Sequence, residues 1–183
     1  HGTLLVRTNH LAEGIALLEQ ALVHAANDDP AEAAECCATL AVGCMWRGQL
    51  GRSIAYTRER IVHAQRCGDP FQLRHTGIML AVLHGLQGDW AGAEAQIGLA
   101  QEQIAPLASP EPLAFLRFVQ GMVAYSRGDE PVAEALLADA IDQFRALGPG
   151  QLVWFLGGLG LAQASLGKLA EAAACAAELE QLV

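Results

Sequence analysis

This sequence of 183 residues lacks the features of several large protein classes. No apolar run approaches the ~18 residues of a membrane-spanning helix, and no signal peptide opens the chain. Nor is it polar enough for a disordered segment, because 52% of its residues are hydrophobic. Alanine dominates that fraction, which favours closely packed helices over a sheet.

Motifs of catalysis are also missing. The pair Gly167-Lys168 is the only Gly-Lys in the chain, and a phosphate-binding loop would need glycine at Ala162 and Ser or Thr at Leu169. No GxSxG, HExxH or GxGxxG sequence stands in the required setting. The six histidines are scattered, and positions such as His24, His75 and His84 are more typical of a helix surface or a core than of catalysis. We therefore expect neither an enzyme nor a bound cofactor.

Basic residues are few, with 11 Lys and Arg against 20 Asp and Glu, and the net charge of −9 disfavours nucleic-acid binding. Six of the basic residues nevertheless cluster in one segment, opposed there by Glu59 and Asp69 alone. One interpretation is a solvated helix face that pairs with acidic neighbours. The other is a docking patch for an acidic partner, or for another domain of the parent protein, made of Arg47, Arg52, Arg58, Arg60, Arg66 and Arg74.

The cysteines number five and include no CxxC pair. An odd number on predicted helices is typical of reduced thiols in a cytoplasmic protein. His63 and Cys67 share a helix face at i,i+4, but Cys37 and Cys44 belong to another helix, whereas zinc needs converging ligands. We expect small apolar core residues rather than a metal site.

What the sequence does contain is a repeat of about 40 residues. A turn position recurs at Asn9, Gly48, Gly88, Gly128 and Gly167, in steps of 39, 40, 40 and 39 residues. Small residues precede it at Ala41, Ala81, Gly121 and Gly160, and follow it at Gly14, Ser53, Ala93, Ala133 and Ala172. A proline series at Pro30, Pro70, Pro110 and Pro149 keeps the same period and marks helix starts. Three series with one period predict stacked helical pairs.

These residues resemble the tetratricopeptide repeat (TPR), carried by Gly88-Asp89-Trp90-Ala91-Gly92-Ala93 and by Arg127-Gly128-Asp129 with Ala133. The usual unit is about 34 residues. The longer unit, with a junction such as Ala64–Pro70, is similar to TPR-like segments of large bacterial multidomain regulators, including LuxR-type activators and cyclase- or kinase-linked signalling proteins. The resemblance implies an all-α, right-handed α-solenoid.

In chain order, the pattern predicts a leading half helix through Arg7, and then four complete helical pairs. The expected helices are 11–26, 31–47, 50–67, 71–87, 90–104, 111–127, 131–147, 151–166 and 169 to the end. We take 1–183 as a single repeat domain, and as a fragment of a longer protein, because both ends fall inside helical pattern. Arg60 departs from the repeat, since it stands where later units have Ala100 and Ala140.

In TPR-like solenoids the first (A) helix of each pair lines the concave face. By register, that face gives an aromatic and methionine-rich set: Met45, Trp46, His75, Met79, Val82, Phe115, Phe118, Met122, Tyr125 and Trp154. Such a groove suits an apolar helix, an extended peptide or a small apolar ligand. The alternative is that these side chains fill the core between helices.

Two function classes follow from this sequence. The first is a scaffold that binds a protein or peptide partner, as the TPR segment of a bacterial transcriptional or signalling regulator. The second is the small-molecule (inducer) sensor domain of such a regulator.

Overall fold

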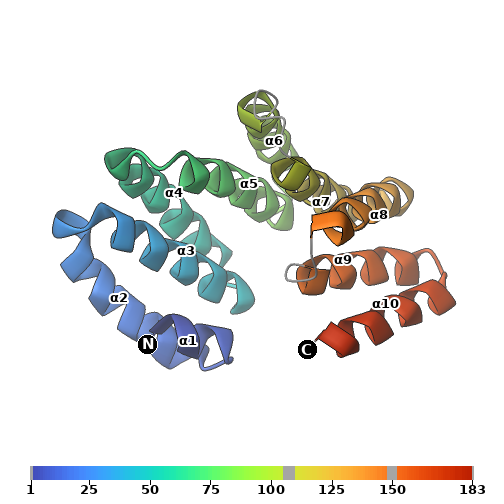
Figure 1. Cartoon of the computed structure of the whole chain (residues 1–183), viewed down its shortest axis with the longest axis horizontal. Helices are drawn as coiled ribbons and strands as arrows, with labels where there is room; N and C mark the ends of the chain where they lie inside the picture. Colours follow the sequence, from blue (N-terminus) through green and yellow to red (C-terminus); the bar gives the residue numbers. More distant parts are fainter. Residues whose placement is uncertain (1, 105–109, 148–151, 183) are drawn as a thin grey trace. The chain divides into compact units, whose positions relative to one another are not determined.

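A computed structural model describes residues 2–104, 110–147 and 152–182, and within them it consists of helices joined by short turns, with no strand (Figure 1). The helices are α1 (Gly2–Arg7), α2 (Leu11–Asp28), α3 (Pro30–Trp46), α4 (Leu50–Cys67), α5 (Pro70–Leu86), α6 (Trp90–Ile104), α7 (Pro110–Ser126), α8 (Glu130–Leu147), α9 (Leu152–Ser165) and α10 (Leu169–Leu182). Their ends agree with the predicted ends to within two residues.

The backbone is left-handed at all five predicted turn positions, and also at Gly68 after α4. Asn9, Gly48, Gly88, Gly128 and Gly167 have φ values from 65° to 82°. Each turn closes in the same way: at the third one, Gly88 N–H donates to the carbonyl of Gly85 and Asp89 N–H to that of His84. This pair of bonds ends a helix in a Schellman motif, where glycine has no Cβ penalty. The 40-residue period of the turn positions therefore reflects the need for a left-handed residue at the end of the first helix of each pair.

The starts of α3 and α5 are fixed by aspartate followed by proline. Asp29 accepts a hydrogen bond from the backbone N–H of Glu32, and Asp69 accepts from those of Phe71 and Gln72. Pro30, Pro70 and Pro110 are the first residues of α3, α5 and α7, where proline loses no helical bond. Pro149, the last of the predicted series, lies outside the described residues.

The small residues of the repeat lie between paired helices. Ser53 Oγ donates to the carbonyl of Ala41 at 2.7 Å, which joins α4 to α3. A Cβ on Gly160 would lie 3.7 Å from the carbonyl oxygen of Ala172, which joins α9 to α10. Ala93 is fully buried. The prediction of antiparallel pairs packed through small side chains is confirmed.

Arg60 stands at the repeat position where later units have alanine, and its side chain is held by hydrogen bonds. Its guanidinium donates from Nε to Gln72 Oε1 at 2.7 Å, and Gln72 in turn donates to Glu35, which connects α4, α5 and α3. Burial lowers the pKa of Arg60 from its usual value. The long side chain thus fills an interface position and its charged end is hydrogen-bonded.

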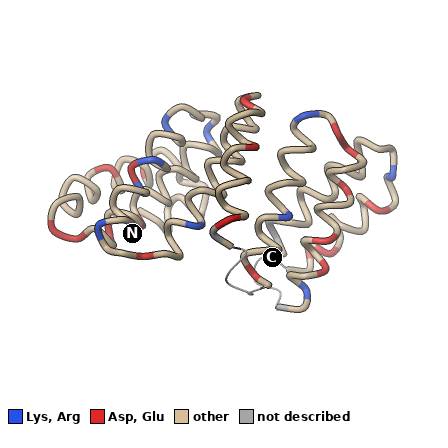
Figure 2. The backbone as a smooth tube through the Cα atoms, turned by 90° about the horizontal axis from the view of Figure 1, so that it is seen from above, with Lys and Arg blue, Asp and Glu red and all other residues tan. Residues whose placement is uncertain are grey.

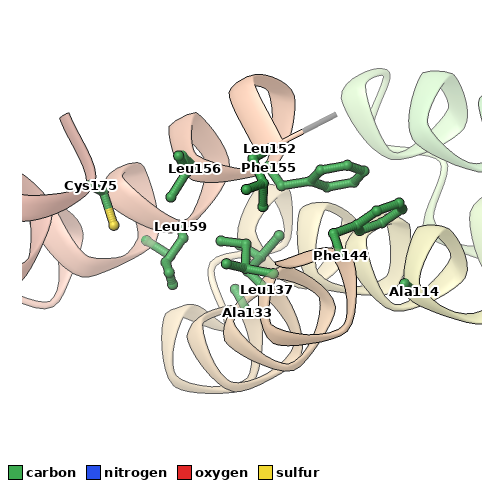
Figure 3. Packing of buried hydrophobic residues seen from close by; sticks show 11 residues of the cluster. Ala114, Ala133, Leu137, Phe144, Leu152, Phe155, Leu156, Leu159 and Cys175 are labelled. Atoms are coloured by element: carbon green, nitrogen blue, oxygen red, sulfur yellow. The ribbon is translucent and has the colours of Figure 1, made fainter. Parts of the chain in front are cut away.

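The chain divides into two compact units, residues 1–83 and 84–183. In the first unit, one core cluster runs from Val6 through Leu18 and Leu40 to Cys44, and a smaller one surrounds Leu83. The second unit has a core built on stacked rings of Phe144 and Phe155, whose centroids are 4.2 Å apart (Figure 3).

Two ion pairs in the second unit occupy equivalent positions of successive repeats. Arg127 Nη1 lies 2.7 Å from Glu94 Oε1, and Lys168 Nζ lies 2.6 Å from Glu134 Oε2. Each cation adjoins a turn glycine, and each glutamate lies on the second helix of the preceding pair.

Within the described residues, no helix has the length and apolarity needed to cross a bilayer.

Candidate functional site

The predicted groove residues of the first unit lie on α3 and α5. Met45, His75, Met79 and Val82 are half-buried, while Trp46 at the end of α3 is 39% exposed. Met45 and Met79 pack against the cluster formed by Ile54, Leu80 and Leu83. Each of these side chains therefore has one side on the core and another at the surface.

Phe71 extends this face by one helical turn and was not predicted. It is 49% exposed, and its ring centroid lies 4.2 Å from that of His75. Phe71, His75 and Met79 are four residues apart, so they form one stripe along α5. The sequence offered a signal for Phe71 in its i,i+4 spacing from His75.

The predicted residues of the second unit form a row along α7. Phe115, Phe118, Met122 and Tyr125 are all half-buried and pack against the core cluster of that unit. The ring centroid of Phe118 lies 4.4 Å from that of Phe155 on α9, edge to face. Tyr125 Oη lies 3.3 Å from Ser165 Oγ.

The row on α7 thus rests on the next helical pair and keeps part of its surface accessible. Trp154 belongs to α9, but its side chain lies outside the described residues. Phe155, the residue beside it, is 1% exposed and supplies the ring on which Phe118 rests.

The basic segment Arg47–Arg74 divides by environment. Arg52 pairs with Glu19, and Arg66 donates to the carbonyls of Ala26 and Asn27 at the end of α2. With Arg60 bound to Gln72, half of the predicted docking patch has partners inside the first unit. Arg47, Arg58 and Arg74 make no ion pair within the described part of the chain.

Acidic charge is concentrated in the second unit. Residues 84–183 contain 12 Asp and Glu and 4 Lys and Arg, and the acidic positions recur on successive helices (Figure 2). An apolar row in a strongly acidic unit favours partners that carry positive charge beside their apolar residues.

The ionisable groups of the chain give little support for catalysis. His84 Nδ1 lies 2.7 Å from Asp89 Oδ2, and Gly92 N–H donates to Asp89 Oδ1 at 3.0 Å, so this pair fastens the start of α6. These bonds lower the pKa of Asp89. Burial raises the pKa of the Cys36, Cys44 and Cys175 thiols, which suits inert core residues.

One set of donor atoms was not foreseen. Cys37 comes together with Glu59 and His63, which lie on the facing helix. Sequence reasoning placed His63 correctly on a helix face, but it considered Cys67, four residues later, instead of Glu59, four residues earlier.

The sequence matches no protein-family model and no curated protein. Solved structures are similar in fold. BtubC (BKLC) from P. vanneervenii has 18% identity and a TM-score of 0.65, and the match covers 99% of this chain and 76% of that one. A Rap protein complexed with Competence and Sporulation Factor has 17% identity and a TM-score of 0.82, over 99% of this chain and 51% of the Rap chain.

A putative kinesin light chain of Podosopora anserina, with nearly identical TPR-like repeats, has 14% identity and a TM-score of 0.61, over 99% of this chain and 90% of that one. This chain spans about half the length of the Rap protein. At such identities the likeness establishes the fold alone. The fold class predicted from the sequence, an all-α solenoid of TPR-like helical pairs, is confirmed.

Proposed function

We propose that this chain is an interaction scaffold that binds a protein or peptide partner through the A helices of its repeats. The supporting observation is the half-buried apolar row on α7, formed by Phe115, Phe118, Met122 and Tyr125. Aromatic side chains on a helix offer large apolar contact area, and methionine side chains adapt to the shape of a partner, which suits a bound helix or extended peptide.

The partner we propose is an apolar segment flanked by basic residues. The second unit, which contains the α7 row, carries an excess of eight acidic charges. Steering by that excess should make association faster at low ionic strength than at high ionic strength. On the first unit, Arg47, Arg58 and Arg74 would contact a different partner, one that is acidic.

We place the chain in a bacterial signalling or transcription regulator. The support is the Rap protein whose structure contains Competence and Sporulation Factor, together with the 40-residue repeat. In this role the chain would be the segment of the regulator that binds the partner.

The test is a selection of ligands from a displayed peptide library, followed by affinity measurements with purified peptide. Met122→Ser should weaken the selected peptide at least about tenfold, as expected for a central contact residue. Val132→Ser is the matched control, because Val132 is 46% exposed on α8, outside the row.

Equal affinities for the two variants would contradict the proposed site. A library that yields no ligand, while a small apolar metabolite binds and shifts the melting temperature, would favour the sensor function instead.

A further inference from the structure

A cluster of metal-binding side chains lies between α3 and α4, within the first unit. The Cys37 thiol, one Glu59 carboxylate oxygen and one His63 ring nitrogen all lie within 4.8 Å of one another. Cys37 is fully buried and His63 is 5% exposed, whereas Glu59 is exposed. Among the residues that the structure describes, this is the one group of three such donors.

The fold brings these donors together by two separate means. Glu59 and His63 are four residues apart on α4 and therefore share one helix face, with His63 Nε2 3.7 Å from Glu59 Oε1. Cys37 comes from the middle of α3, the antiparallel partner of α4 in the same repeat. Of the three donor residues, Glu59 alone is exposed to solvent.

The present contacts of His63 are weak ones. Its Nδ1 lies 3.5 Å from Arg66 Nη1, and the Nε2 contact with Glu59 is longer still. Good hydrogen bonds between such atoms are 2.7–3.2 Å long. The imidazole is thus buried beside a carboxylate and a thiol without a short bond to either.

The donor set matches the chemistry of a borderline divalent transition ion. Zinc takes sulfur at about 2.3 Å and imidazole nitrogen or carboxylate oxygen at about 2.0–2.2 Å, so tetrahedral ligands lie roughly 3.5 Å apart. Small rotations of the Glu59 and His63 side chains would bring the donors from their present separations to that value. A thiolate and a carboxylate together balance the charge of a divalent ion.

The surroundings of the Cys37 thiol lower the affinity expected for the ion, because the thiol must lose its proton to bind. Burial, followed by the charge of Glu59, raises the pKa of Cys37 to about 12, while Arg60 acts in the opposite direction. A coordinated thiol loses its proton to solvent when the ion binds. The positive charges of Arg60 and Arg66 oppose the ion, so affinity should be lower than in a site with four anionic or neutral ligands.

We propose that Cys37, Glu59 and His63 form a binding site for one zinc-class divalent ion, with the fourth coordination position left to water or to a partner. The ion would fasten α3 to α4 in the second repeat. This site is independent of the partner-binding row on α7, and neither proposal depends on the other.

The test is a titration of the reduced, metal-free chain with Co²⁺, followed by absorbance. A near-ultraviolet thiolate-to-cobalt charge-transfer band should saturate at one ion per chain and disappear when Zn²⁺, which binds more tightly, is added. Cys37→Ala should abolish the band. Glu59→Gln alters an exposed side chain only, so it should fold normally and weaken Co²⁺ at least about tenfold, the loss typical even of an outer-shell partner.

Cys67→Ser is the matched control. Cys67 is an exposed thiol on α4, four residues beyond His63, and its loss should leave the band unchanged. The absence of a band in the wild-type chain would overturn the proposal. A band that survives Cys37→Ala would also overturn it, since the band would then come from another thiol. Equal Co²⁺ affinities for Glu59→Gln and wild type would overturn it too, since Glu59 would then not be a ligand.

Discussion

Gly121 on α7 lies so close to Leu137 on α8 that a Cβ at Gly121 would be 2.7 Å from Leu137 Cγ and 3.2 Å from its backbone nitrogen. Both residues are buried, and Gly121 belongs to the small-residue series of the repeat. The distance to the backbone matters most, because a helix backbone cannot move aside as a side-chain end can. The helices of this pair therefore pack at a separation that only glycine allows.

This contact makes a prediction for Gly121→Ala. Overpacking against Leu137 should destabilise the chain by about 1–3 kcal/mol, despite the better helix propensity of alanine. Gly157→Ala on α9 is the matched control, because nothing lies within 4 Å of its Cβ position. That variant should gain up to about 1 kcal/mol. Urea denaturation midpoints check both signs, and two stabilised variants would show that α7 and α8 are farther apart.

Asp89 should make stability depend on pH. Its pKa is lowered first by the Gly92 N–H and then by His84, so its contribution is present above the ordinary aspartate pKa of 3.8 and is lost as pH falls below it. Asp89→Asn keeps an acceptor for Gly92 but loses the charge. We expect the variant to be less stable than wild type at pH 7, with the difference shrinking toward pH 3.

Urea denaturation at the two pH values measures this difference. Glu102→Gln, at an exposed position of the same helix α6, should leave the pH dependence unchanged. A constant difference between Asp89→Asn and wild type would mean that the aspartate charge contributes nothing to folding.

The five thiols should differ sharply in reactivity. Cys67 is exposed, whereas Cys36, Cys37, Cys44 and Cys175 are buried. Since only an accessible thiolate reacts with a disulfide reagent, we expect one fast thiol per folded metal-free chain, and five after unfolding in denaturant. Cys67→Ser should remove the fast phase. Rapid reaction of two or more thiols in the native chain would contradict the burial of the other four.

The sequence predicted most of what depends on local backbone chemistry. A left-handed turn position favours glycine, as at Gly88, and the first position of a helix tolerates proline, as at Pro70. Both requirements therefore leave a signal at fixed spacing. The neighbouring glycines of α9 have different surroundings. Gly158 lies close to Met122 and Phe118, while Gly157 faces open space, a difference that depends on helix rotation and not on composition.

Contacts between helices were harder to foresee. The register indicated which α7 residues share a stripe, but their half-burial depends on Phe155 of the next pair, through the ring contact with Phe118. Likewise, the i,i+4 spacing identified a face of α4 at His63, yet only the packing of α3 against it brings Cys37 there. Side-chain sets drawn from two helices leave no spacing signal in one sequence.

The central claim is that the A helices carry the partner-binding surface, and the methionines report on it directly. All three methionines of the chain, Met45, Met79 and Met122, are half-buried and stand at predicted groove positions. The measurement is NMR of methionine ε-methyl groups labelled with carbon-13, assigned by single Met→Leu variants and titrated with a selected peptide. We predict a chemical-shift change at Met122 that saturates with the peptide. Methionine resonances that all stay in place at saturation would contradict the claim.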